Sequence, residues 1–137
     1  MIFTTDLRIR FAHCDPAGIV FYPRYFEMIN GVVEDWCAQG LGYSFHEMHV
    51  VCSLGLPTVR LETDFVKVSK LGETLRAELS VTQLGGASLE LALRLVGPDG
   101  DLRVKVKLVL VMMDLKKHRA VAIPPALRER MQDYLSS

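Results

Sequence analysis

Residues 15–42 read DPAGIVFYPRYFEMINGVVEDWCAQGLG, a short loop that runs into one long amphipathic helix. Pro23 suits the first helical position, because the N–H that proline lacks would have no partner inside the helix there. Gly40 and Gly42 end the pattern, since glycine favours the position that follows a helix. Between these limits apolar residues recur at steps of three and four and predict one buried face: Phe26, Ile29, Val33 and Trp36 or Cys37.

Gly31 lies inside this predicted helix, where glycine costs ~1 kcal/mol relative to alanine. A close approach of the helix to a neighbouring backbone would explain a residue without a side chain at this position. We therefore expect a sheet to pack closely against the helix at Gly31.

Stretches of alternating apolar and polar residues flank the helix and predict β-strands. The first runs over residues 4–11, where Leu7, Ile9 and Phe11 alternate with charged side chains. Further stretches alternate in the same way after the helix and an irregular segment. They cover residues 58–68, 75–81, 89–95 and 102–110.

The order of these elements is one strand, one long helix, four strands and a short terminal helix. The turns at residues 85–86 and 98–100 are short and contain glycine, so the strands that they join pair antiparallel. Pro124-Pro125 opens the terminal helix, which reaches Tyr134. We predict an α+β fold in which an antiparallel five-stranded sheet wraps around a long central helix, in a single domain of residues 1–137.

Composition and charge argue against several classes of protein. Lys and Arg total 16 and Asp and Glu total 16, whereas a nucleic-acid-binding protein normally carries an excess of basic residues. The longest apolar stretch is far shorter than the ~20 residues of a membrane-spanning helix, and no targeting pattern precedes the first strand. Cys14, Cys37 and Cys52 show no CxxC spacing, which favours a reducing compartment over disulfides or a zinc site. These observations predict a soluble cytoplasmic protein that binds neither nucleic acid nor membranes.

Asp15 is the strongest candidate for a reactive side chain, because it lies in the loop between the first strand and the helix. A helix N-terminus offers free N–H groups and a positive dipole, which polarise a carbonyl and favour an ionised carboxylate. A carboxylate beside such amides can form a hydrolytic site without a metal. The alternative is an ordinary Asp15-Pro16 turn, in which the carboxylate accepts a hydrogen bond from its own backbone.

Residues 15–25, DPAGIVFYPRY, closely resemble the motif of the 4-hydroxybenzoyl-CoA thioesterase family of hot-dog-fold proteins. The order of elements matches that fold over essentially the whole chain. The resemblance implies an acyl-CoA thioesterase in which Asp15 is the nucleophile or the general base. It also implies that the backbone N–H of Tyr22 points at the thioester oxygen and that Gly18 lets substrate approach the loop. Arg119 resembles a basic position that some members use on the phosphates of coenzyme A.

Three further residues near the motif are candidates for substrate binding. Phe21 and Tyr25, together with Tyr22, offer an aromatic lining that suits an aromatic or short acyl group. His13 lies two residues before Asp15 and either orients that carboxylate or packs at the base of the loop.

The basic residues that would bind coenzyme A phosphates depart from the family pattern. Gly85-Gly86-Ala87 stands where an aromatic-substrate member carries basic residues, so the nucleotide end must be held differently here. Arg103, Lys105 and Lys107 alternate along the last predicted strand. We interpret them as the solvated face of that strand, with attraction of the phosphates as the alternative.

Other notable side chains fit structural roles. Cys14 is beside Asp15, but neighbours in an extended loop point to opposite sides, so we expect a buried, inert thiol. No recognisable metal-ligand spacing joins the histidines other than His13, which we expect on the surface or in loops: His46, His49 and His118. Trp36 and the methionines are expected in the core or at a subunit interface.

The prediction is hydrolysis of an aromatic or short-chain acyl-CoA, similar to 4-hydroxybenzoyl-CoA, to a free acid and coenzyme A, without a metal or cofactor. The alternatives are a non-catalytic acyl-CoA-binding protein of the same fold and a thioesterase for acyl-carrier proteins. Exposed strand edges are usually paired or covered, and hot-dog proteins resemble one another in pairing two sheets edge to edge. The resemblance therefore implies a homodimer with a shared active site, and a homotetramer by association of dimers.

Overall fold

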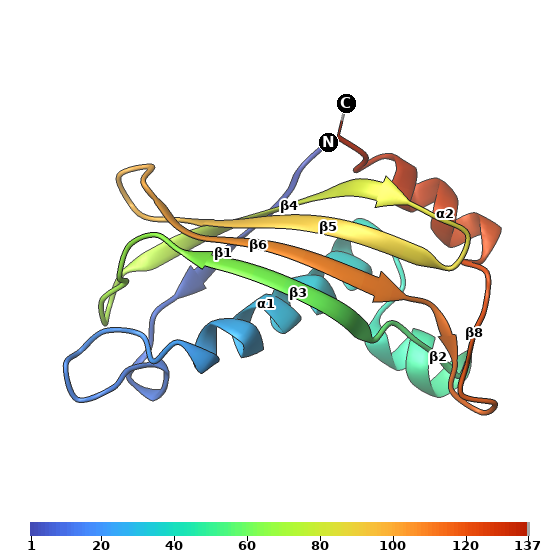
Figure 1. Ribbon diagram of the computed structural model, residues 1–137, viewed down its shortest axis with the longest axis horizontal. Coiled ribbons are helices and arrows are strands. Elements are labelled where there is room, and N and C mark those ends of the chain that lie inside the picture. Colours follow the sequence, from blue (N-terminus) through green and yellow to red (C-terminus); the bar gives the residue numbers. More distant parts are fainter. Residues whose placement is uncertain (137) are drawn as a thin grey trace.

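A five-stranded antiparallel sheet dominates the computed structural model, which describes residues 1–136. Its strand order is β1-β4-β5-β6-β3, so β1 and β3 are the edges. Figure 1 shows the helix α1, Pro23–Asp35, lying along one face of this sheet. The predicted architecture is therefore confirmed. The strands are β1 Phe3–Arg8, β3 Thr58–Phe65, β4 Thr74–Leu84, β5 Ser88–Val96 and β6 Leu102–Val111.

The core lies between α1 and the inward-facing side chains of the sheet. Val32 of α1 is fully buried, and Trp36 at the end of the helix is buried with it. Along β4 and β5 the alternation is strict, because every second residue from Leu75 to Val81 and from Leu89 to Leu95 is at most 1% exposed. Burial of each large apolar side chain contributes about 1.5 to 3 kcal/mol, so these two strands and α1 supply much of the stability.

The long helix begins and ends where the sequence indicates. α1 starts at Pro23 and continues without a break into the π-helical turn η2, Trp36–Gly40. The chain then turns at Gly42, whose φ of +77° lies in the region that favours glycine. The expectation for Gly31 is wrong, since a Cβ at that position would meet nothing within 4 Å.

Two of the predicted strands end earlier than their alternation suggests. The first stops at Arg8, and the chain then coils into a short 3₁₀ turn, η1 Phe11–His13, in which Phe11 is 82% exposed. The strand predicted over residues 58–68 stops at Phe65. Just beyond these ends, the Ile9 N–H donates to the Glu73 carbonyl and the Val66 N–H donates to the Arg103 carbonyl, contacts with distant segments that local alternation does not report.

A second, small sheet lies at the end of the molecule opposite the loop that precedes α1 (Figure 1), and it is not apparent in the sequence. Its strands β2 Leu54–Gly55, β7 Met113–Asp114 and β8 Arg119–Ala120 are too short to show a period. The π-helical segment η3, His46–Val51, packs beside β2.

The terminal helix α2, Pro125–Gln132, starts as predicted and contacts β4. Tyr134 follows α2, and its ring meets Trp36 edge to face at 5.7 Å. Within residues 1–136, none of the helices combines the length and the apolar character that crossing a membrane requires.

Candidate active site

The loop that leads into α1 forms a small hairpin. The Asp15 N–H donates to the Ile19 carbonyl at 3.0 Å, and the Phe21 N–H donates to the His13 carbonyl at 2.9 Å. Gly18 turns the chain between these pairs with a φ of +77°, a conformation that strains other residues. The hairpin therefore holds Asp15 at a fixed position in front of the helix.

The Asp15 carboxylate is anchored by one oxygen. Its Oδ1 accepts a hydrogen bond from the Ala17 N–H at 2.9 Å, so the turn interpretation of Asp15-Pro16 is correct. Within residues 1–136, Oδ2 accepts no hydrogen bond. Asp15 is half-buried and lines an open depression of about 340 Å³ with Phe21 and Arg24. One oxygen thus fixes the side chain, and the carboxylate borders a space that a ligand can enter.

The start of α1 presents a single free amide. Pro23 has no N–H, the Arg24 N–H donates to the Phe21 carbonyl at 2.9 Å, and the Tyr25 N–H donates to the Tyr22 carbonyl at 3.1 Å. Of the amides from Tyr22 to Tyr25, all within the described residues, only that of Tyr22 has no acceptor. It lies at the positive end of the helix dipole, where an oxyanion is favoured.

The three candidate aromatic residues do not share one environment. Phe21 and Tyr22 are 48% and 59% exposed, and Phe21 faces the Asp15 depression. Tyr22 and Tyr25 contact Phe65 of β3, with ring centres at 6.0 and 5.9 Å, and line a separate depression of about 270 Å³. Burial raises the pKa of Tyr25, and a hydrogen bond with Ser69 opposes that rise.

His13 and Cys14 both bond to Arg10 at the base of the loop. The His13 Nδ1 accepts from the Arg10 N–H at 2.9 Å, and the Cys14 Sγ donates to the Arg10 carbonyl at 3.5 Å. His13 makes no hydrogen bond with Asp15 in the described part of the chain. Desolvation, and then the negative charge of Asp15, raises the pKa of Cys14 and disfavours the thiolate.

Arg119 lies at the opposite end of the molecule from Asp15. Figure 1 shows β8, the strand of the second sheet that contains Arg119, at one end of the molecule and the loop before α1 at the other. The Arg119 side chain is exposed. A single chain therefore does not bring these two candidate residues together.

An apolar groove of about 540 Å³ runs between α1, η3 and the β3 edge. Phe26, Ile29 and Val33 line it, so the stripe predicted as core is partly the wall of a groove. His49, expected on the surface or in a loop, also lines the groove, and its Nδ1 bonds to a backbone carbonyl at 2.9 Å. The distribution of apolar residues in the sequence does not distinguish a groove wall from a closed core.

The prediction for Arg103 is wrong. Lys105 and Lys107 are exposed as expected, but Arg103 is only 4% exposed. Its guanidinium donates to both Glu73 carboxylate oxygens at 2.9 and 3.0 Å, and to Asp101 at 2.6 Å. The hydrogen bonds from Arg103, and after them the hydrogen bond from the Lys70 N–H, lower the pKa of Glu73 to about 2. Only the spacing of Asp101 and Arg103 after a tight turn hints at this cluster in the sequence.

Comparison with known proteins identifies a family. A family model described as the thioesterase-like superfamily matches residues 9–131. A 1,4-dihydroxy-2-naphthoyl-CoA hydrolase of Synechocystis sp. is 27% identical to this chain over 81 residues. That match covers 59% of this chain and 58% of the relative, so it spans little more than half of either protein.

Solved structures show the same fold. A Staphylococcus aureus protein in complex with CoA matches with a TM-score of 0.90 at 18% identity, over 100% of this chain and 87% of that chain. The Synechocystis 1,4-dihydroxy-2-naphthoyl-CoA thioesterase matches with 0.88 at 20% identity, over 97% of each chain. A gentisyl-coenzyme A thioesterase matches with 0.83 at 22% identity, over 95% and 99%. These similarities confirm the predicted hot-dog fold.

Proposed function

Since the chain belongs to the thioesterase-like superfamily, we propose that it hydrolyses an acyl-CoA thioester to a free acid and coenzyme A. The observation that carries this proposal is the Asp15 carboxylate, which is anchored by Oδ1 and free at Oδ2, in the loop that leads to the free Tyr22 amide. The comparisons support the superfamily, whereas the narrower resemblance to 4-hydroxybenzoyl-CoA thioesterases remains part of the proposal.

The proposed chemistry needs only these two groups and water. Oδ2 of Asp15 either attacks the thioester carbonyl or takes a proton from a water molecule that attacks it. In both routes the carbonyl oxygen becomes an oxyanion, which the Tyr22 N–H stabilises, and the C–S bond then breaks with departure of the coenzyme A thiolate. In the first route, water next hydrolyses the mixed anhydride on Asp15 and releases the acid.

An aromatic acyl group, similar to 4-hydroxybenzoyl, is the proposed substrate class, with a short acyl chain as the other option. The apolar groove of about 540 Å³ falls within the range of about 300 to 1,000 Å³ that is typical of small-molecule sites. Its wall is apolar except for a few polar side chains such as Asn30, His49 and Thr58, which can orient a ring hydroxyl. The names of two similar proteins, a dihydroxynaphthoyl-CoA hydrolase and a gentisyl-CoA thioesterase, support a hydroxylated ring.

We propose a homodimer formed by pairing of the β3 edges, and association of two dimers into a tetramer. β3 carries exposed apolar side chains along an unpaired edge, namely Val59, Leu61 and Phe65. Such an edge normally needs a partner. The Thr58 end of β3 borders the apolar groove, and its Phe65 end contacts Tyr22.

A twofold antiparallel pairing of β3 would set the Phe65 end of one chain against the Thr58 end of the other. The Asp15 loop of one subunit would then lie beside the groove and the β8 end of its partner. This arrangement would also explain the separation of Asp15 and Arg119 within one chain, because Arg119 of the partner subunit would reach the coenzyme A phosphates. Gly18 and His13 keep their proposed places in the loop, and Phe21 lines the Asp15 depression. Tyr25, in the first turn of α1, remains a proposed substrate-binding residue through the separate depression beside Phe65.

The remaining features of the proposal concern the setting of the enzyme. The free cysteines Cys14, Cys37 and Cys52 suit a reducing compartment, which supports a cytoplasmic location. The single domain predicted for residues 1–137 is also retained. The chemistry requires no cofactor, because a thiolate is a good leaving group.

The test is hydrolysis of a panel of aromatic and aliphatic acyl-CoAs, followed by release of free thiol, with wild type and Asp15→Asn. Asparagine keeps an Oδ1 that can accept from the Ala17 N–H, so the loop should stay in place. We expect a loss of kcat of about a hundredfold or more, in line with general-base contributions. Asp99→Asn, an exposed carboxylate in the turn between β5 and β6 and outside the Asp15 loop, is the matched control and should keep full activity.

Near wild-type turnover by a folded Asp15→Asn variant would remove Asp15 from the mechanism. Wild-type protein that binds acyl-CoA without turnover would instead support the non-catalytic alternative. Hydrolysis only of acyl groups on a carrier protein would support the acyl-carrier-protein thioesterase.

A further inference from the structure

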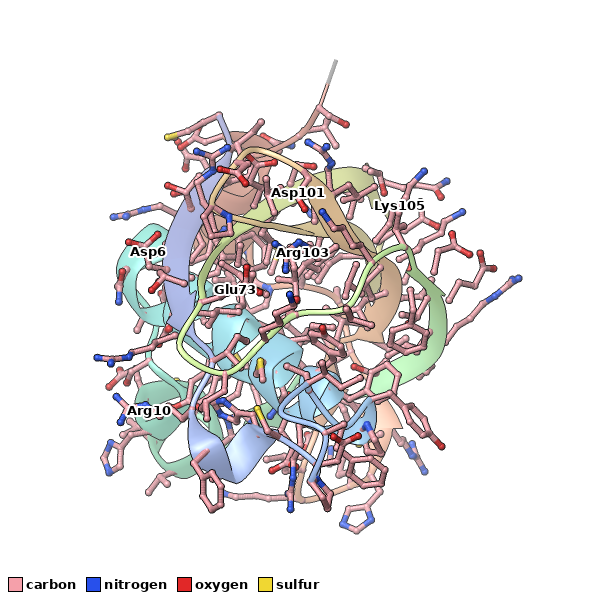
Figure 2. All side chains as sticks on the ribbon, turned by 90° about the vertical axis from the view of Figure 1, so that its left-hand side faces the viewer. Asp6, Arg10, Glu73, Asp101, Arg103 and Lys105 are labelled. Carbon is pink, nitrogen blue, oxygen red and sulfur yellow. The ribbon has the colours of Figure 1, made fainter. Side chains whose placement is uncertain are left out.

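A charge cluster around the buried Arg103 side chain lies at the end of the molecule that carries the Asp15 loop. Figure 2 views this end and shows Arg103 between Glu73 and Asp101. Lys67 also contacts Asp101, with Nζ to Oδ2 at 3.1 Å, so the cluster holds two basic and two acidic groups and is neutral overall. Since its charges balance, such a cluster can persist in a partly dry environment.

A β-bulge aims the Arg103 side chain into this cluster. Leu95 of β5 pairs with Val104, but the next residue, Val96, pairs with Leu102, so Arg103 is the extra residue of β6. Bulges characteristically redirect a side chain away from the alternation of its strand. Gly97 leaves the space that the guanidinium needs, because a Cβ there would lie 2.6 Å from the Arg103 Nε.

The guanidinium holds one segment, residues 66–73, which we call the strap. Besides Glu73, the Arg103 Nη1 donates to the Val68 carbonyl at 3.0 Å and to the Ser69 hydroxyl at 3.2 Å. The backbone carbonyl of Arg103 accepts from the first two residues of the strap, at 2.9 and 3.2 Å. One arginine thus binds the strap at its beginning, middle and end.

The strap in turn holds both stems of the Asp15 loop. On the incoming side, the Ile9 N–H donates to the Glu73 carbonyl at 2.8 Å, and the Ile9 carbonyl accepts from Gly72 at 2.9 Å. On the outgoing side, the Val20 N–H donates to the Ser69 carbonyl at 3.0 Å. The Leu71 N–H donates to the Gly18 carbonyl, also at 3.0 Å. The position of the loop between these stems therefore depends on the position of the strap.

The same cluster reaches the first turn of α1. Ser69, which is fully buried, accepts a hydrogen bond from Arg103, and its side chain is near enough to the Tyr25 hydroxyl to lower the pKa of that group. Tyr25 is three residues after Tyr22, and its N–H donates to the Tyr22 carbonyl. The group that would attack the thioester and the group that would stabilise the oxyanion are therefore braced by one side chain.

We propose that Arg103 is a positioning residue for thioester hydrolysis: through the strap it sets the Asp15 carboxylate and the Tyr22 amide relative to each other. This proposal rests on the proposed function. It distinguishes arginine from lysine, because only the planar fork of a guanidinium can bind both Glu73 oxygens, Val68 and Ser69 at once. Lysine at this position would keep the charge but lose most of these bonds.

The test compares wild type with Arg103→Lys, Glu73→Gln and the control Arg94→Lys. Arg94 also binds a carboxylate, Glu78, at 3.0 Å, but it is about half exposed and lies outside the strap. For each protein we measure the melting temperature, amide hydrogen exchange at Val20 and Leu71, and kcat and KM well below the melting temperature.

For Arg103→Lys we expect exchange at Val20 and Leu71 to accelerate about tenfold or more, with kcat reduced between about tenfold and about a hundredfold. KM should change less than about threefold, because the groove that binds the acyl group is not part of the strap. Glu73→Gln should shift the same quantities in the same direction by less, and Arg94→Lys should leave them unchanged. If Arg103→Lys does not fold, Glu73→Gln carries the test, because it leaves Arg103 paired with Asp101.

A purely structural role would lower the melting temperature and leave kcat per folded molecule unchanged, which overturns the proposal. Wild-type exchange rates at Val20 and Leu71 in a folded Arg103→Lys variant overturn it as well. Failure of the proposed function is a separate result, seen as a wild-type protein that hydrolyses no acyl-CoA. In that case the exchange rates still decide whether Arg103 holds the loop.

Discussion

The Asp15 carboxylate combines two interpretations that the sequence presents as alternatives. Its Oδ1 closes the turn with the Ala17 N–H, as an ordinary Asp-Pro turn would. The same hydrogen bond fixes the direction of Oδ2, and a reacting oxygen must be held in place to act efficiently. The turn is therefore a requirement of the proposed chemistry and does not argue against it.

The Tyr22 amide can be tested without changing any neighbouring hydrogen bond. Tyr22 has a φ of −52°, which proline can adopt, so Tyr22→Pro removes the N–H together with an exposed side chain whose ring contacts Phe21 and Phe65. We expect this variant to fold and to lose kcat by about a hundredfold to a thousandfold, the cost of one oxyanion donor. Tyr22→Phe keeps the amide and should stay near wild type in the same hydrolysis assay. Equal kcat values for the two variants would show that this amide does not stabilise the transition state.

Glu73 gives the protein a defined dependence of stability on pH. Its pKa falls from an ordinary value of 4.5 to about 2, chiefly through hydrogen bonds from Arg103 and then from the Lys70 N–H. A lowered pKa stabilises the folded state above pH 4.5, and this contribution is lost as the pH falls from about 4.5 towards 2. The difference in free energy of unfolding between wild type and Glu73→Gln should therefore shrink over this range.

Urea denaturation between pH 7 and pH 3 measures this difference. Glu27→Gln is the matched control, because Glu27 forms an exposed ion pair with Arg24 and should change stability little at any pH. A constant difference between wild type and Glu73→Gln across the range would mean that the Arg103 contacts do not stabilise the ionised carboxylate.

At the scale of the elements, α1 retains a residue that lowers its stability without filling a packing role. Gly31 lies in the helix interior, and within residues 1–136 a Cβ there would meet nothing within 4 Å. Gly31→Ala should raise the free energy of unfolding by about 0.5 to 1 kcal/mol, as measured by chemical denaturation. A destabilised variant with reduced mass in solution would instead place this face of α1 against another subunit.

β6 follows the alternation of core and surface side chains except at the bulge formed by Arg103. Val104, Val106, Leu108 and Leu110 face the core as predicted. The bulge at Arg103 sits next to the strand start, where the side chain and the backbone carbonyl of Arg103 bond to the strap. Lys105 and Lys107, beyond the strap, remain exposed.

At the scale of the whole molecule, the exposed β3 edge predicts the assembly. Leu61 lies near the middle of β3, so a charge there would lie close to its own copy across a twofold axis. Leu61→Asp should therefore shift the mass in light scattering from a dimer or tetramer to the 15.4 kDa of one chain. It should also abolish hydrolysis, because the proposed site is shared between subunits.

Gln83→Asp is the matched control for this experiment, since it adds the same charge at an exposed position of β4, away from the β3 edge. It should keep both mass and activity. A wild-type protein that is active at 15.4 kDa would rule out the shared site altogether.

The sequence by itself indicates the long helix, the five strands of the main sheet and the loop that carries Asp15. Period-two alternation places the five strands, Pro23 and Gly42 bound the helix, and the motif beginning at Asp15 marks the loop between them. Each of these features depends on residues that are close together in the chain. Local sequence therefore carries the information that places these strands, the helix and the loop.

Only the tertiary structure decides how the candidate site is supported and divided. The Arg103 side chain is buried by partners that lie 30 to 35 residues away in the chain, so the alternation along β6 does not predict its burial. Arg119 and Asp15 lie at opposite ends of one molecule, although both resemble positions of a single family site. Burial and distance are properties of packed segments, and packing brings together residues whose separation along the chain leaves no periodic trace in the sequence.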